Sequence, residues 1–234
     1  MTEPRAVLFD AGGIFLLPQH ERIIGAFSRA DVVIASEGLD DAHYRAAARF
    51  TTEVDFEADW VGSWRGYLDA YVDACGVTID DPGDVHRHLD SEFADAALWL
   101  SVAQGCREGL RAVAQTGVLL GVVSNADGMM GNRLRELEIL QVGPGLGVEV
   151  GCVIDSGDVG VMKPDPRIFK IALDALEVEP ADAWYVGDMP AFDIVGARRA
   201  GIRPFIIDPL GLHVDADYDR VASLTELAAL IAAA

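Results

Sequence analysis

The chain has 234 residues, 51% of them hydrophobic, and its acidic residues outnumber its basic ones by 38 to 18. This length and apolar content exclude a mainly disordered chain and allow one large domain, or a core with a smaller companion. The formal net charge of -20 argues against nucleic acid and anionic lipid as partners, because both are negatively charged. It leaves room for an anionic small substrate, because one metal ion or lysine can reverse the field locally.

The sequence predicts neither a membrane span nor a signal peptide. Its apolar runs are far shorter than the ~20 residues of a membrane helix, and its start, MTEPRAVLFD, has no long apolar segment before Asp10. The three cysteines, Cys75, Cys106 and Cys152, are odd in number and widely scattered, which is typical of a reducing compartment. We therefore expect a cytoplasmic protein.

Five apolar runs predict strands of a parallel sheet. They lie at 6–10, 118–125, 184–188 and 203–208, with a weaker one at 150–155. Such near-continuous runs are typical of strands that are buried on both faces. Helical periods lie between them: one at 166–176, capped by Asp165 with Pro166 in its first turn, and one at 190–200, ended by Gly201. This alternation predicts an α/β fold, a Rossmann-like doubly wound parallel sheet.

The segment from 19 to 98 shows helical periods and no convincing strand. One apolar stripe comprises Trp60, Val61, Trp64, Leu68, Tyr71, Val72 and Cys75, and another comprises Val85, Leu89 and Phe93. We predict a smaller all-helical cap domain at 19–98 on a core formed by 1–18 and 99–234. Trp60 and Trp64 are expected in the cap core. His86 and His88 are expected on a solvated face, because residues two apart on a helix do not face each other.

Polar residues follow three of the predicted strands. Asp10 ends the first, Ser124 and Asn125 end the second, and Asp188 ends the third, while Lys163 lies in the loop VMKPDP ahead of a helix. Sites in open α/β sheets lie beyond the carboxyl ends of the strands. We therefore expect these side chains to share one cleft, over which the helical insert can close.

The order of four motifs resembles the haloacid dehalogenase-like superfamily. They are VLFDAGG at 7–13, VVSNADG at 122–128, GVMKPDPRIF at 160–169 and YVGDMPAFDIVGARRAGI at 185–202. Each fragment alone is modest evidence, but four in this order, with a helical insert between the first two, cover most of the chain. The resemblance implies a Mg²⁺-dependent phosphohydrolase that acts on a small phosphorylated substrate. It leaves open whether the chain is a monomer or a homodimer.

The resemblance also implies a role for each residue of the predicted cleft. Asp10 would be the nucleophile that forms an aspartyl-phosphate. Asp10 and Asp188 would bind Mg²⁺ together with the backbone carbonyl of Gly12. Asp193 would bind the metal or orient its waters, although we find it equally plausible that it favours the positive end of the 190–200 helix. The remaining residues would act on the phosphoryl group: Ser124 and the amides around Asn125 by donating to its oxygens, and Lys163 by neutralising charge in the transition state.

Gly12 departs from the family pattern. Phosphatases of this family usually carry a second aspartate there, which protonates the leaving oxygen and then deprotonates the attacking water. A glycine cannot do this. Three residues could supply the missing group from nearby or from the cap, and each is a weak candidate: His20, Glu21 and His43. A substrate with a good leaving group, such as an acyl phosphate, would not need it.

Two other functions remain open for such a chain. It could bind a phosphorylated ligand with little turnover, as a regulatory relative, or it could be a metal-independent 2-haloacid dehalogenase, whose nucleophile also ends the first strand. A phosphonate-cleaving enzyme would need a cap lysine, and residues 14–100 contain none. The pair Asp188 and Asp193 favours a metal site and therefore phosphoryl chemistry.

Overall fold

A computed structural model describes residues 3–54 and 56–234 of the chain. Within these residues six parallel strands form one sheet, in the order β10-β9-β8-β1-β4-β7. The strands are β1 (Ala6–Phe9), β4 (Leu119–Ser124), β7 (Cys152–Asp155), β8 (Ala183–Gly187), β9 (Arg203–Ile207) and β10 (Asp219–Val221). The strand expected at 150–155 is divided at Gly151. Its second part, β7, joins the six-stranded sheet, whereas β6 (Val148–Val150) ends before Gly151 and pairs with β5 (Leu140–Val142). The predicted doubly wound parallel sheet is confirmed.

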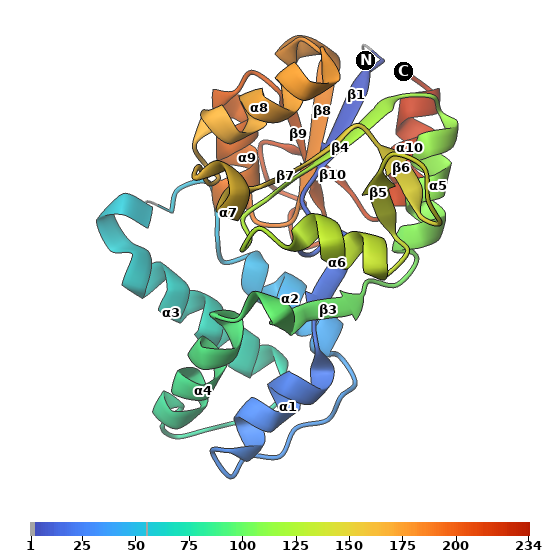
Figure 1. Cartoon of the computed structure of the whole chain (residues 1–234). Helices are drawn as coiled ribbons and strands as arrows, with labels where there is room; N and C mark the ends of the chain where they lie inside the picture. Colours follow the sequence, from blue (N-terminus) through green and yellow to red (C-terminus); the bar gives the residue numbers. More distant parts are fainter. Residues whose placement is uncertain (1–2, 55) are drawn as a thin grey trace.

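Helices cover both faces of the sheet, as Figure 1 shows. They are α5 (Cys106–Gln115), α6 (Met130–Glu136), α7 (Ser156–Val159), α8 (Pro166–Leu176), α9 (Pro190–Arg199) and α10 (Leu224–Ala232), with a short 3-10 turn, η2 (Pro180–Asp182). Val7 and Phe9 of β1 pack on the side of α5 and α10, while Ala6 and Leu8 pack on the side of α8 and α9. Strand residues alternate in direction, so both faces are buried and the run is apolar throughout.

The segment between β2 (Leu16–Pro18) and β3 (Trp99–Val102) is helical. It holds α1 (His20–Ser28), α2 (Leu39–Ala47), α3 (Phe56–Ala74), α4 (Gly83–Phe93) and the 3-10 turn η1 (Ala96–Leu98). These helices have a separate apolar core and lie at the end of the sheet away from both chain termini (Figure 1). β2 and β3 pair antiparallel, so the two connections between the helices and the sheet run side by side. We propose 18/19 and 98/99 as the boundaries of the cap.

Two expectations about the helical segment are wrong. Val61 is 78% exposed, because α3 contains a kink at Asp59 and its first turns project from the packed part of the segment. His86 is buried, because α4 turns it toward α3, where its Nε2 lies 3.3 Å from an oxygen of Asp69. Trp64 packs against the cap core as expected, whereas the side chain of Trp60 lies outside the described part of the structure. Across the described residues, no helix combines the length and apolar character that crossing a membrane requires.

Candidate active site

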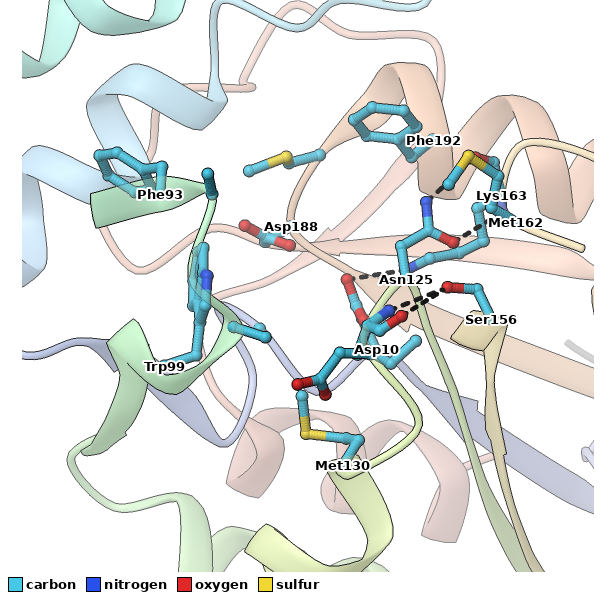
Figure 2. Close-up of a pocket in the computed structure, with 17 residues that line it drawn as sticks. Asp10, Phe93, Trp99, Asn125, Met130, Ser156, Met162, Lys163, Asp188 and Phe192 are labelled. Atoms are coloured by element: carbon cyan, nitrogen blue, oxygen red, sulfur yellow. Dashed lines mark hydrogen bonds and ion pairs between the residues drawn. The ribbon is translucent and has the colours of Figure 1, made fainter. Parts of the chain in front are cut away.

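The carboxyl ends of β1, β4 and β8 border one cavity of about 450 Å³. β1 is the strand at which the sheet order reverses. β4 and β7 lie on one side of it, and the later strands β8, β9 and β10 lie on the other. The loops at such a switch point diverge, which leaves a crevice there. Figure 2 shows the side chains that face it. The cavity is lined by Asp10, Gly12, Phe93, Ala94, Ala96, Trp99, Ser124, Asn125, Ala126, Asp127, Met130, Ser156, Met162, Lys163, Asp188, Met189 and Phe192.

Lys163 is a buried ammonium with three acceptors. Its Nζ lies 2.8 Å from Oδ2 of Asp10, 2.8 Å from Oδ1 of Asp193 and 2.9 Å from the hydroxyl of Tyr185. The side chain is only 2% exposed. An isolated charge at this depth would be costly, but two carboxylates and a hydroxyl satisfy all three of its donors. Lys163 therefore holds the Asp10 side chain at the edge of the cavity.

Asp193 lies behind this pair and is fully buried. Its Oδ1 accepts hydrogen bonds from Lys163 and from the Tyr185 hydroxyl, and its Oδ2 accepts the backbone N–H groups of Asp188 and Met189 at 3.0 and 2.9 Å. Each oxygen thus already accepts two hydrogen bonds, which is about its capacity. The N–H groups belong to the start of α9, so the contact agrees with the helix-terminus interpretation of this residue.

Asn125 holds the loop that carries Lys163. Its Oδ1 accepts the Lys163 backbone N–H at 2.7 Å, and its Nδ2 donates to the Lys163 carbonyl at 3.1 Å. The side-chain amide is therefore engaged with the backbone, although the residue still borders the cavity. Ser124, at the end of β4, is buried and lines the same cavity.

A histidine from the cap reaches the predicted metal ligand Asp188. His43 of α2 is fully buried, and its Nε2 lies 2.8 Å from Oδ2 of Asp188, while its Nδ1 lies 3.2 Å from the hydroxyl of Tyr67. The next residue, Tyr44, donates its hydroxyl to the carbonyl of Gly13 at 2.7 Å. Helix α2 is thus joined to the end of β8 and to the loop that follows the nucleophile. Of the three weak candidates, only His43 reaches the site: His20 pairs with Asp40, and Glu21 is exposed.

The structure gives different steric reasons for a glycine at residue 12 and for a glycine at residue 13. A Cβ on Gly12 would lie 3.3 Å from the ring of Trp99, so a side chain there would require the ring to move by a few tenths of an ångström. Gly13 has φ +68°, and a Cβ there would lie 2.4 Å from the carboxyl carbon of Asp188. Only glycine allows this backbone conformation and this approach at residue 13. The sequence analysis did not select Trp99, because a tryptophan near the end of a helical segment has the same pattern as a core residue.

The electrostatics of the cluster make Asp10 easier to protonate than an ordinary aspartate. Burial raises the pKa of Asp10 to about 7; Lys163 opposes the shift, and the carboxylates of Asp193 and Asp188 add to it. Burial also raises the pKa of Asp188, against the lowering effect of His43. For Lys163 burial opposes the charged form, but the two carboxylates outweigh it, and the pKa is raised.

The carboxylates at this site fit a hard divalent cation. Oxygens of Asp10, Asp188 and Asp193 lie within 4.8 Å of one another. Asp10 and Asp188 border the cavity, as does Gly12, and Oδ1 of Asp188 accepts no hydrogen bond from any described residue. Mg²⁺ prefers oxygen ligands and takes one or two carboxylates. Asp10, Asp188 and the Gly12 carbonyl could therefore hold it, while Asp193 positions its neighbours.

Comparison with known proteins identifies the family. Residues 4–201 match the family model of the haloacid dehalogenase-like hydrolases. The chain is 36% identical over 123 residues to Haloacid dehalogenase-like hydrolase domain-containing protein 3 of Bos taurus, which is 53% of this chain and 46% of that protein. It is 49% identical over 67 residues to Phosphoserine phosphatase of Thermus thermophilus, which is 29% of this chain and 27% of that protein. The chain thus spans less than half the length of these two curated relatives.

The fold itself recurs among solved structures. A crystal structure of a dehalogenase superposes with a TM-score of 0.57 at 22% sequence identity, and 98% of each chain is covered. At this identity the likeness concerns the fold alone. The family match over residues 4–201 establishes that the chain belongs to the haloacid dehalogenase-like hydrolases.

Proposed function

We propose that this protein is a Mg²⁺-dependent phosphohydrolase acting on a small phosphorylated substrate. The observation that carries the proposal is the contact between Lys163 and the two carboxylates: its Nζ lies 2.8 Å from both Asp10 and Asp193, beside the cavity that Asp188 also borders. Such a site pairs a carboxylate nucleophile with fixed positive charge, as phosphoryl transfer requires. The relative named Phosphoserine phosphatase supports the same class of reaction.

The reaction would proceed in two displacements at phosphorus. In the first, a carboxylate oxygen of Asp10 forms a bond to phosphorus while the bond from phosphorus to the leaving oxygen breaks, and that oxygen keeps the electron pair. In the second, a water oxygen forms a bond to phosphorus while the bond from phosphorus to the Asp10 oxygen breaks. Inorganic phosphate leaves with the water's protons or passes one to solvent, and the Asp10 carboxylate is restored. Bound Mg²⁺ would neutralise charge between the carboxylates and the phosphoryl group. Lys163, whose three donors stay with Asp10, Asp193 and Tyr185, would supply positive charge beside the phosphoryl oxygens, and Ser124 would donate to them. Asn125 would keep Lys163 in place.

Gly12 restricts the substrates that this site could process. The titratable side chains that border the cavity, within the described part of the chain, are Asp10, Asp127, Lys163 and Asp188. Asp188 is paired with His43, and Lys163 with its carboxylates, so no acid stands ready at residue 12. We therefore propose substrates whose leaving oxygen departs without a proton, such as aryl or acyl phosphates.

Activity measurements on purified protein test the proposal. We expect hydrolysis of acetyl phosphate and 4-nitrophenyl phosphate that requires Mg²⁺ and falls by roughly 10³-fold or more in Asp10→Asn. Asp174→Asn, the same change at an exposed residue paired with Lys170, should retain the activity. Binding of phosphate esters without turnover would instead support the regulatory relative. Chloride release from 2-chloropropionate in the presence of a chelator would support the dehalogenase and overturn the proposal.

A further inference from the structure

Much of the cavity wall around the carboxylates is apolar. Its hydrophobic side chains come from α4, α6 and α9, from the start of β3, and from the loops before Lys163 and after β8: Phe93, Trp99, Met130, Met162, Met189 and Phe192. Figure 2 shows Phe93 and Trp99 on one side of the cavity, and Met162 and Phe192 across it. A phosphoryl group placed at Asp10 would therefore carry its remaining substituent into contact with aromatic rings and thioethers.

The charged side chains among the described lining residues leave no partner for a second anion on the substrate. Lys163 is the only cationic side chain among the described lining residues, and its three donors are already engaged. Asp127 is the remaining charged side chain among the described lining residues. Arg133 binds it in a bidentate pair, at 2.5 and 2.8 Å. A carboxylate on the substrate would thus meet apolar surface and negative charge, and burying it unpaired is costly.

From this wall and this charge distribution we infer that the phosphorylated substrate carries an uncharged aromatic group. The inference rests on the proposed function for the position of the phosphoryl group, and it goes further by excluding phosphorylated amino acids and carboxylic acids. An aromatic ring would bury its faces against Trp99 and Phe192, and because it is uncharged it needs no charged partner. The chain then differs in substrate class from its relative named Phosphoserine phosphatase.

Binding of matched phosphonates tests the inference without any need for turnover. Benzylphosphonate and 4-carboxybenzylphosphonate share the same ring and phosphonate and differ by one para carboxylate. In calorimetry with Mg²⁺ present, we expect benzylphosphonate to bind about tenfold or more tightly than its carboxylated analogue. Equal affinity, or tighter binding of the analogue, would overturn the inference.

A charge added at the rim provides a second test. Met162 is 60% exposed and lines the cavity, so Met162→Lys places an ammonium where a substrate carboxylate would lie. We expect the preference for benzylphosphonate to narrow to about threefold or less. Met129 is 46% exposed and lies outside the cavity lining, so Met129→Lys adds the same charge nearby and should keep the preference. If both variants narrow the preference, net charge rather than the cavity wall sets the selectivity. If neither narrows it, the carboxylate is not excluded at this wall. Either result overturns the inference.

Turnover separates a failure of this inference from a failure of the proposed function. We expect kcat/KM for phenyl phosphate to exceed that for 4-carboxyphenyl phosphate and for O-phosphoserine by about tenfold or more. Hydrolysis that depends on Asp10 but favours the carboxylated compounds would overturn the inference and leave the proposed function intact. If no compound is hydrolysed in a way that depends on Asp10, the proposed function is wrong. The preference between the two phosphonates can still be measured in that case, so the inference keeps its own test.

Discussion

Single residues decide the chemistry of this site. For Gly12, the sequence motif shows that a side chain is missing but does not show what lies beside the glycine. The sequence shows that residue 12 has no side chain, but the structure shows what takes its place: the Trp99 ring, 3.3 Å from where a Cβ would lie. The glycine and the tryptophan therefore form a complementary pair. Inserting an aspartate would push against a side chain that is itself packed between the cap and the core.

We accordingly expect Gly12→Asp alone to lower activity toward aryl phosphates, because the new carboxylate and the Trp99 ring compete for space. Gly12→Asp combined with Trp99→Ala removes the clash and supplies an acid. Its activity toward alkyl phosphates, whose leaving oxygen needs protonation, should exceed that of Trp99→Ala by about 10²-fold. Steady-state kinetics of the wild type, the two single variants and the double variant check this. An unchanged alkyl phosphatase rate in the double variant would show that residue 12 is not the missing acid position.

The pKa of Asp10 predicts a link between Mg²⁺ and protons. The pKa is raised to about 7, so below that pH the free site holds a proton that a bound cation must displace. Apparent Mg²⁺ affinity should therefore fall by about tenfold for each pH unit below about 7 and level off above it. Calorimetry in two buffers of different ionisation enthalpy would measure the proton released. Mg²⁺ binding at pH 6 without proton release would contradict the raised pKa of Asp10. In Asp10→Asn, the proton release that comes from Asp10 should disappear.

At the scale of elements, helix α2 joins the cap to the nucleophile loop. His43 reaches Asp188 at the end of β8, and Tyr44 donates to the carbonyl of Gly13. A third contact, from the backbone N–H of Ala191 in α9 to the carbonyl of Phe50 beyond α2, lies at the same junction. These polar contacts hold the cap against the carboxyl edge of the sheet, where the cavity lies.

Tyr44→Phe tests this junction with the loss of a single hydrogen bond. We expect the free energy of unfolding to fall by about 1 kcal/mol, because the hydroxyl's hydrogen bond to Gly13 disappears. Amide hydrogen exchange should rise in residues 11–16. Thr116→Val removes a comparable contact, to the carbonyl of Val113 at 2.7 Å, at the end of α5 beside residues 3–5, and should raise exchange only around that turn. Equal exchange at residues 11–16 in both variants would mean that Tyr44 does not hold the loop.

For the whole molecule, the net charge of -20 opposes compaction. Buried ion pairs at the site and surface pairs such as Lys170 with Asp174 offset only part of this repulsion. Salt screens the exposed charges over about 8 Å at 0.15 M, whereas buried pairs are screened much less.

Raising NaCl from about 0.01 to 0.15 M should therefore increase the melting temperature by a few degrees, because repulsion between exposed carboxylates is screened more than the buried pairs are weakened. Differential scanning calorimetry, with sucrose at equal osmolality as the control, measures the change. A lower melting temperature in salt would mean that ion pairs outweigh the repulsion.

The sequence alone determined the layered α/β core. Strands buried on both faces must be apolar throughout, and Asp165, Pro166 and Gly201 mark helix ends through purely local geometry. It also indicated the cleft residues, because polar groups that end parallel strands meet at one edge. Their individual roles stay predictions until the activity measurements are made.

Only the tertiary structure decided which groups touch. Tyr185 shares Lys163 with Asp193, His43 crosses from the cap to Asp188, and Trp99 occupies the space beside Gly12. None of these contacts has a local signature, because each joins different elements of the fold, and their separation depends on how those elements pack together. The burial of His86 escaped the helical pattern for the same reason: periodicity gives the face of a helix, and the neighbouring helix decides whether that face is covered.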